Sequence, residues 1–251
     1  VEDLSVIASQ LASSSPGTYD RGFGCLILKK YASKALTISQ AINLVKTETA
    51  YINIDHIADY LRVVGHDEQT VVDSLKAIYA DEAGIYTNVE RCRAIIAAGQ
   101  FKSKKSLPAL QARLGRESDR ENQRRLLDAF RDIPDASNFQ PLMNYINGGR
   151  ADLDPTVDAA GKEVAPVDRV RAQKDCLESR EILKRALVAV AVIDSEESNN
   201  LIELAFLTAK EQWLSEFVQP LRKVNDYMRD RVEVLEERND RSAVLPERKP
   251  E

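Results

Sequence analysis

Residues 53–84 read NIDHIADYLRVVGHDEQTVVDSLKAIYADEAG and contain two helix signals on either side of one glycine. In the first half, Ile57, Ala58 and Leu61 are spaced as expected for side chains on one face of a helix. Gly65 follows, and glycine often ends a helix because it adopts the left-handed conformation without steric cost. We therefore predict a helix that ends at this glycine.

The second half of the stretch carries a complete set of helix signals. Asp67 can cap the first turn by accepting a hydrogen bond from a backbone amide. Val71, Leu75 and Ile78 follow at helical spacing, and Gly84 provides a stop. The stretch thus predicts two short helices joined by a glycine turn.

The same alternation of an apolar helical stripe with a turn signal continues on both sides of this stretch. Two capping boxes, Thr37 with Gln40 and Ser118 with Glu121, mark predicted helix starts. Besides the helices that follow these boxes, short helices are predicted over residues 1–13, 23–35, 88–98, 106–114 and 138–146.

The composition favours an all-α fold. Gly and Pro number only 10 and 9, aromatic residues make up 6%, and many runs are rich in strong helix formers such as Ala, Leu, Glu and Lys. A hydrophobic share of 43% and a charged share of 30% are typical of a globular chain rather than a disordered one. With 251 residues, the chain suits one large domain or two small ones.

The clearest break in the pattern is residues 148–168, which hold three Gly and two Pro and show no periodic apolar residues. A loop of this length is uncommon within a compact domain. We therefore predict a lobe of short helices over 1–147, a linker or long loop over 148–168, a long-helix region over 169–241 and a disordered tail over 242–251.

The long-helix region is predicted to form a C-terminal pair of helices with coiled-coil character. The first helix is expected from Asp168 to Ile193, and the last from about Ser195 to about Asn239. Pro220 should kink or split the last helix, because proline lacks a backbone donor and clashes with the preceding turn.

Apolar residues recur along the predicted last helix at seven-residue intervals, with Lys210 and Arg231 at two of the intermediate positions. Such a stripe either binds a second copy or a partner, or packs on the helix over 168–193 as an antiparallel hairpin. The length of the stripe and its polar positions favour some free surface. The candidate partner-binding residues are Leu207, Leu214, Phe217, Leu221, Val224, Met228 and Leu235.

Positive charge is concentrated in one segment, although the net charge of the chain is −5. Residues 100–131 hold nine Lys and Arg against four Asp and Glu. This segment could bind phosphate, an RNA backbone or an acidic partner, or it could form a solvated face with local pairs to Glu117, Asp119 and Glu121. The candidate binding residues are Lys102, Lys104, Lys105, Arg113, Arg116, Arg120, Arg124 and Arg125.

Residues 53–82 also have the rhythm of a DNA-reading helix–turn–helix motif. A recognition helix normally presents several Lys, Arg, Asn or Gln side chains. Here the second helix begins with Asp67 and Glu68, which would repel phosphate, and it offers only Lys76. A plain helical hairpin is therefore the preferred interpretation.

No catalytic constellation is evident in the sequence. The two histidines, His56 and His66, lie beside carboxylates, but no HExxH or Cys/His metal spacing accompanies them. GxSxG, GxGxxG and P-loop motifs are absent. The chain is therefore predicted not to be an enzyme, and no metal or cofactor is expected.

The cysteines indicate the compartment. Cys25, Cys92 and Cys176 are odd in number and widely spaced, which argues against a disulfide framework and favours a reducing, cytoplasmic compartment. The longest apolar run, Ala186–Ile193, is too short to cross a bilayer, so no membrane association is expected.

Residues 105–147 carry a family resemblance. The run KSLPALQARLG up to Gly115 is followed by RESDRE and then by LLDAFRDI up to Ile133. It resembles a unit of a HEAT or armadillo-type helical repeat, with a Leu-Pro-x-Leu first helix, an acidic turn and a second helix with Leu and Ala inward. The resemblance implies a stacked-helix surface that binds other macromolecules, and it carries over no functional residue. No clean period recurs along the chain, and the C-terminal third departs from the pattern.

Together these patterns predict a non-catalytic interaction or assembly subunit that joins a protein partner, or itself, through its C-terminal helices. The alternative is a nucleic-acid-binding protein, either an RNA-coating nucleoprotein or a DNA-binding protein, that uses the basic cluster over 102–125.

Overall fold

The computed structural model describes residues 2–148, 169–193, 195–208 and 212–222, which are helical apart from short loops. No strand occurs among these residues, so the predicted all-α class is confirmed. Residues 212–222 are helical. The other elements are α1 (Glu2–Ser13), α2 (Tyr19–Lys30), α3 (Ile38–Thr47), α4 (Tyr51–Val63), α5 (Glu68–Tyr79), α6 (Asn88–Phe101), the 3-10 helix η1 (Lys104–Ser106), α7 (Leu107–Leu114), α8 (Arg120–Asp132), the 3-10 helix η2 (Ala136–Asn138), α9 (Phe139–Gly148), α10 (Arg169–Ala191) and α11 (Glu196–Thr208).

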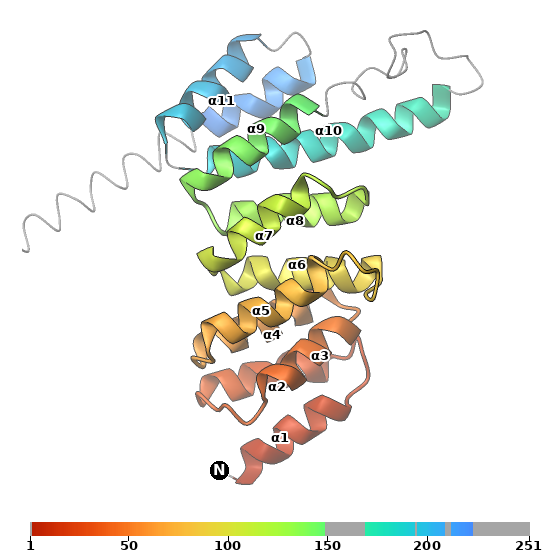
Figure 1. Ribbon diagram of the computed structural model, residues 1–251, viewed down its shortest axis with the longest axis vertical. Helices are drawn as coiled ribbons and strands as arrows, with labels where there is room; N and C mark the ends of the chain where they lie inside the picture. The colour runs from red at the N-terminus through yellow and green to blue at the C-terminus, as the bar shows by residue number, and fades with distance from the viewer. Residues whose placement is uncertain (1, 149–168, 194, 209–211, 223–251) are drawn as a thin grey trace, which may run out of the picture.

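The helices stack in two layers along the long axis of the molecule (Figure 1). The even-numbered helices from α2 to α10 pack on one another in chain order, and each odd-numbered helix from α1 to α9 packs on the even helix that follows it. Within the odd layer, α1, α3 and α5 are successive neighbours, η1 joins α5 to α7, and α7 contacts α9. The described chain is therefore a stack of helix pairs, as in an α-solenoid.

The helix pairs are not evenly spaced along the sequence. The odd helices begin at residues 2, 38, 68, 107 and 139. The intervals between these starts differ because both the helices and the loops between them differ in length. This difference explains why no clean period recurs in the sequence. Stacked pairs are nonetheless the architecture that the resemblance over 105–147 implies, and α7 and α8 form one such pair.

Local side-chain chemistry fixes several helix starts. Thr37 and Gln40 form the predicted capping box: Thr37 Oγ1 accepts from the Gln40 N–H at 3.3 Å, and Gln40 Oε1 accepts from the Thr37 N–H at 2.9 Å. Asp67 caps α5 as predicted, because its carboxylate accepts from the Thr70 N–H at 2.8 Å. These contacts satisfy backbone donors that have no partner within the helix.

Several predicted helix boundaries are wrong, and two of them show why. The cap of α8 is Asp119, which accepts from the Asn122 N–H, and not the neighbouring Ser118. Gly99 follows the predicted helix over 88–98 and was expected to end it, but it lies inside α6, where a Cβ would be 3.0 Å from Cα of Ala129 in α8. This glycine permits the close packing of α6 on α8, a use that sequence spacing does not distinguish from a helix stop.

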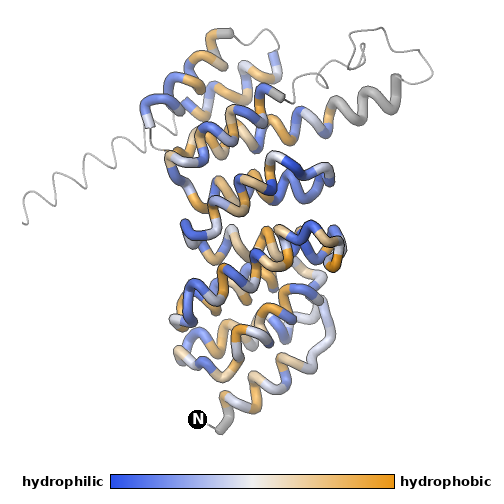
Figure 2. Tube along the Cα trace, in the orientation of Figure 1, coloured by the Kyte–Doolittle hydropathy of each residue, from blue (hydrophilic) through white to orange (hydrophobic). Residues whose placement is uncertain are grey.

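The hydrophobic core lies between and within the two layers. Tyr60, Tyr79 and Phe130 are among its largest fully buried side chains. The Tyr60 hydroxyl donates to the backbone oxygen of Leu36 at 2.9 Å, so its polar end is satisfied although it is buried. Figure 2 shows apolar and polar residues alternating along the helices of both layers, as expected when each helix buries one face.

The C-terminal helices differ from their prediction. The helix α10 matches the predicted helix over 168–193, but it packs on α8 and α9 as well as on α11. Arg222 Nε donates to Glu203 Oε2 at 2.6 Å, whereas these residues would be about 28 Å apart along one straight helix. The chain therefore reverses direction between α11 and residues 212–222, and the prediction of a single helix running from about Ser195 to about Asn239 is wrong.

Among the described residues, none of the helices combines the length and apolar character needed to span a membrane. The predicted linker over 148–168 and the predicted tail over 242–251 lie almost entirely outside the described residues, so the predicted division of the chain stays a prediction.

Candidate functional site

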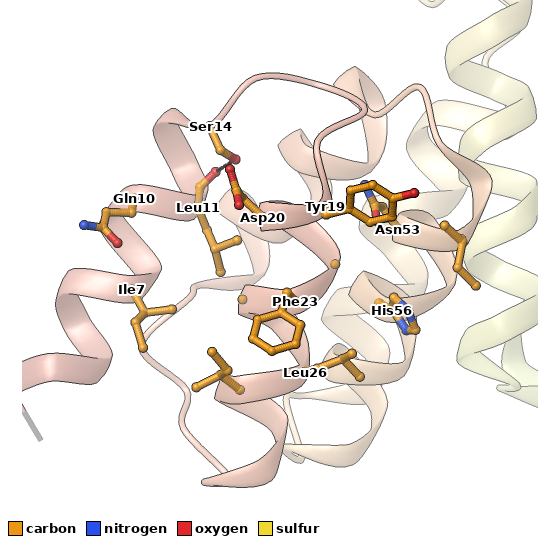
Figure 3. Close-up of a pocket in the computed structure, with 14 residues that line it drawn as sticks. Ile7, Gln10, Leu11, Ser14, Tyr19, Asp20, Phe23, Leu26, Asn53 and His56 are labelled. Atoms are coloured by element: carbon orange, nitrogen blue, oxygen red, sulfur yellow. Dashed lines mark hydrogen bonds between the residues drawn. The ribbon is translucent and has the colours of Figure 1, made fainter.

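An apolar groove of about 650 Å³ opens between α1, α2 and α4, at the end of the stack where the described chain begins. In Figure 3 the Phe23 ring occupies its centre, with Ile7 and Leu11 of α1 on one side and His56 of α4 on the other. Ile52, one turn before His56 in α4, also lines the groove. Three helices thus contribute to one open, mostly apolar surface.

Large apolar side chains in the groove are open to solvent. Tyr19 is 90% exposed, Phe23 is 66% exposed and Ile52 is 57% exposed. Tyr19 and Phe23 are one turn apart on α2, so they present a continuous aromatic surface. Covering one such side chain contributes about 1.5–3 kcal/mol, and contiguous exposed apolar surface often marks an interaction site.

Two glycines on α2 place Phe23 in this position. A Cβ at Gly22 would lie 2.5 Å from Oδ1 of Asn53 in α4, and a Cβ at Gly24 would lie 2.5 Å from Cδ2 of Leu11 in α1. The helices α1 and α4 can therefore approach α2 closely on both sides. Glycine inside a helix costs about 1 kcal/mol relative to alanine, so this local sequence favours close packing around Phe23 over helix stability.

A buried polar network holds the loops beside the groove. The Arg21 side chain, 4% exposed as a residue, donates from Nη2 to the backbone oxygen of Ser14 at 2.6 Å and from Nη1 to Oγ1 of Thr47 at 3.0 Å. Asn53 Nδ2 donates to the backbone oxygen of Thr18 at 2.9 Å. These bonds connect the α1–α2 loop to α2, α3 and α4, and so fix the walls of the groove.

The counter-ion of Arg21 is the fully buried Glu48, whose Oε2 lies 3.5 Å from Arg21 Nη1. Glu48 Oε1 accepts from the N–H groups of Gly17, Thr49 and Ala50 at 2.7–2.9 Å. Burial by itself raises the pKa of this carboxyl, but the backbone hydrogen bonds outweigh burial and hold the pKa below its ordinary value. Glu48 is therefore a structural anion that supports the groove.

The described cysteines are poor nucleophiles. Burial raises the pKa of the Cys25 thiol to about 12 and that of Cys92 to about 11, although nearby Arg21 and Arg125 oppose the effect. Both thiols are protonated at neutral pH, whereas the thiolate is the reactive form.

The two histidines do not form a common site. His56 lines the groove, whereas His66 lies after the end of α4 with Nε2 3.4 Å from the Tyr60 hydroxyl. Burial is the main cause that lowers the pKa of His66, so its neutral form is favoured. Among the described residues, no group of three or more His, Cys, Asp or Glu could hold a metal ion.

The predicted seven-residue stripe is divided by the chain reversal. Leu207 on α11 is 70% exposed, whereas Leu214 and Phe217 are half-buried against the core and Leu221 is buried. These residues therefore do not share one exposed helix face. The other three candidates, Val224, Met228 and Leu235, lie outside the described residues.

Most members of the predicted basic cluster are paired with acidic side chains. Lys104 Nζ lies 2.9 Å from Asp135 Oδ2, and Lys105 Nζ lies 2.7 Å from Glu68 Oε2. Lys102 is exposed at the end of α6 with a left-handed backbone conformation. These lysines lie near the start of α7.

The five arginines of the cluster lie at the end of α7 or on α8. Four of them form ion pairs: Arg113 with Glu117, Arg116 with Glu82, and both Arg124 and Arg125 with Glu121. The fifth, Arg120, donates from Nη1 to Oγ of Ser179 on α10 at 3.1 Å. The structure thus pairs most of this positive charge with acidic side chains of the same chain.

The residues of the groove were not among those predicted from the sequence. The predicted helix begins at Phe23, whereas α2 begins at Tyr19. The prediction therefore leaves Tyr19 outside the helix and does not place it beside Phe23. A signal was nevertheless present, because the run Gly22–Phe23–Gly24 places a large apolar residue between two glycines. In a helix this run is unfavourable unless neighbouring helices pack closely beside it.

No protein-family model, curated protein or solved structure matches this chain.

Proposed function

We propose that this chain is a non-catalytic protein–protein interaction subunit. The observation that carries the proposal is the apolar groove between α1, α2 and α4, with Tyr19, Phe23 and Ile52 exposed together in it. Aromatic side chains are enriched at the centres of protein interfaces, where they fill pockets on the partner. A stack of helix pairs suits this role, because it holds such a surface on rigid elements.

The same features argue against catalysis at this site. The ionisable side chains that line the groove are those of Tyr19, Asp20 and His56, and they are set in a mainly apolar surface. The buried polar groups beneath it are committed to the loops, as Glu48 is to three backbone amides. A site of this kind suits the binding of an apolar surface.

The C-terminal helices have a secondary role, because the exposed Leu207 on α11 offers further apolar surface at the other end of the stack. The finer organisation that we propose is a lobe of short helices over 1–147 and a long-helix region over 169–241.

A cytoplasmic location fits the buried, unpaired thiols of Cys25 and Cys92.

Nucleic-acid binding through the basic cluster is the less favoured function. Ion pairs with acidic side chains neutralise much of the cluster. Exposed Lys102 and the weakly held, solvent-exposed Arg116 are the members best placed to meet phosphate. Loss of binding to a single-stranded RNA on reversal of Arg120, Arg124 and Arg125 to Glu would support this alternative.

The groove is tested by affinity capture from the source cells with the full chain, followed by reconstitution of the captured complex from purified proteins. Phe23→Asp places a charge at the centre of the groove and should weaken the reconstituted complex by at least about thirtyfold. Val89→Asp, which alters an exposed apolar residue on α6 outside the groove, is the matched control. Equal affinities for the wild type and the Phe23→Asp variant would overturn the proposal.

A further inference from the structure

We propose that the groove binds the C-terminal apolar stripe of a second copy of this chain, so that copies associate head to tail. This inference rests on the proposed function and names its partner. The occupant is residues 224–235, where Val224, Met228 and Leu235 continue the seven-residue stripe of the sequence.

Chemical complementarity is the first argument. The groove is lined mainly by apolar side chains from three helices, and its carboxylate, Asp20, is exposed in the first turn of α2. In the stripe, Arg231 occupies the seam position between Met228 and Leu235. Arg231 is the one cation at the seam positions of this segment, and Asp20 is the one carboxylate that lines the groove, so this pair would fix the register of the stripe.

The surroundings of the groove favour this register. Asp20 is the one carboxylate among the residues that line the groove, so it is the anion there with which an arginine would pair. The exposed aromatic pair, Tyr19 and Phe23, offers an arginine side chain further favourable contact through cation–π interaction.

Reach is the second argument, and it selects a second copy over the same chain. Arg222 is fixed to Glu203 of α11, and Val224 follows it by two residues. The groove lies at the α1 end of the stack, whereas α11 packs on α10 at the other end (Figure 1). The helices α2 and α10 are separated by four packing steps, or roughly 30–40 Å.

Val224 lies at most about 7 Å from Arg222 even along a fully extended chain, so a stripe that begins with Val224 cannot reach the groove of its own chain. The groove and the stripe are therefore complementary surfaces at opposite ends of one molecule. Contacts between such ends are heterologous, and they produce open chains of copies or closed rings rather than isologous dimers.

The test is a charge exchange in the full chain, read by sedimentation velocity over a range of protein concentrations. Asp20→Arg and Arg231→Asp should each weaken self-association by about fivefold, and the double variant should restore it. Phe23→Asp should abolish self-association, whereas Val89→Asp should leave it unchanged. Thermal unfolding of each variant would show that the fold is retained.

A second measurement uses a fluorescein-labelled peptide of residues 222–240 as the probe. The peptide should bind the full chain, compete with self-association, and lose affinity for the Phe23→Asp variant. Partners of unrelated sequence that bind while the peptide does not would overturn this inference and leave the proposed function in place.

The two proposals fail in different ways. A chain that stays monomeric at every concentration, or a double variant no better than the single variants, overturns the head-to-tail contact alone. If Phe23→Asp changes neither self-association nor capture of any partner, the groove is not an interaction surface and both proposals are wrong.

Discussion

Arg21 and Glu48 face each other across 3.5 Å beneath the groove, with side chains that are 5% and 0% exposed. Arg21 belongs to α2, whereas Glu48 lies between α3 and α4 and also binds the N–H of Gly17 in the α1–α2 loop. One ion pair thus connects all the elements around the groove. Removing one partner from such a pair leaves an uncompensated buried charge, which is strongly destabilising.

The first prediction concerns Glu48→Gln. The variant should lose about 3 kcal/mol of stability at neutral pH, because the buried Arg21 charge loses its counter-ion. Urea unfolding followed by circular dichroism measures this loss. Glu82→Gln, which removes an exposed partner of Arg116, is the control and should cost less than about 1 kcal/mol.

The same carboxylate predicts the pH dependence of stability. Its pKa in the folded state is lower than the ordinary value of 4.5, so its contribution is complete above pH 4.5 and is lost as the pH falls through the folded pKa. The wild type should therefore lose stability below pH 4.5 more steeply than Glu48→Gln. Parallel pH profiles for the two proteins would contradict this assignment.

The second prediction concerns Gly24→Ala. Alanine improves helix propensity by about 1 kcal/mol, but its Cβ would lie 2.5 Å from Cδ2 of Leu11, which is buried. Overpacking of this kind costs typically about 1–3 kcal/mol, so a net loss of about 1 kcal/mol is expected from thermal unfolding.

Gly115→Ala is the matched control for this substitution. Its backbone is in the right-handed helical region, and the atom nearest to an added Cβ would be the Ala112 backbone oxygen at 3.9 Å. The control should therefore gain up to about 1 kcal/mol. A gain of similar size at Gly24 would show that α1 and α2 do not need this close contact.

These glycines also show how far the sequence predicts the fold. The apolar spacing and the capping residues Thr37 and Asp67 predicted helices that the structure contains, because both signals act within a few residues. Gly99 carries the same local signal as a helix stop, yet it lies inside α6 against Ala129. Whether a glycine ends a helix or allows close packing depends here on Ala129, which is 30 residues away in the chain. A local sequence pattern cannot indicate such a distant contact.

The candidate site was harder to predict for a similar reason. The stripe from Leu207 to Leu221 was assigned to one helix because its spacing is regular, but the Glu203–Arg222 pair shows that the chain turns back within it. The groove joins α1, α2 and α4, and its exposed Phe23 has the same apolar character as a core residue. Periodicity identifies apolar faces and does not show which of them stay uncovered.

The third prediction concerns the contact between α8 and α10. Arg185 Nη1 donates to Oδ1 and Oδ2 of Asp128 at 2.5 and 2.6 Å, and Arg125 and Arg131 of α8 lie within 3.6 Å of the same carboxylate. A double-mutant cycle of Arg185→Ala with Asp128→Ala should give a coupling free energy of about 1 kcal/mol, because the carboxylate is largely buried. Additive effects of the two substitutions would show that the pair does not hold α10 in the stack.

The fourth prediction concerns thiol reactivity. Cys25 and Cys92 are buried, and burial raises the pKa of their thiols to about 12 and about 11. In a Cys176→Ser variant, which leaves only these two thiols, labelling by Ellman's reagent at pH 8 should be slow and should accelerate with added urea as the helices open.

Because Cys25 lies on α2 between the helices that form the groove, Glu48→Gln should speed the labelling of Cys25 more than that of Cys92. Mass spectrometry of the labelled peptides measures the two rates separately. Rapid labelling of Cys25 in the native wild type would contradict the close packing of α2 on which the groove depends.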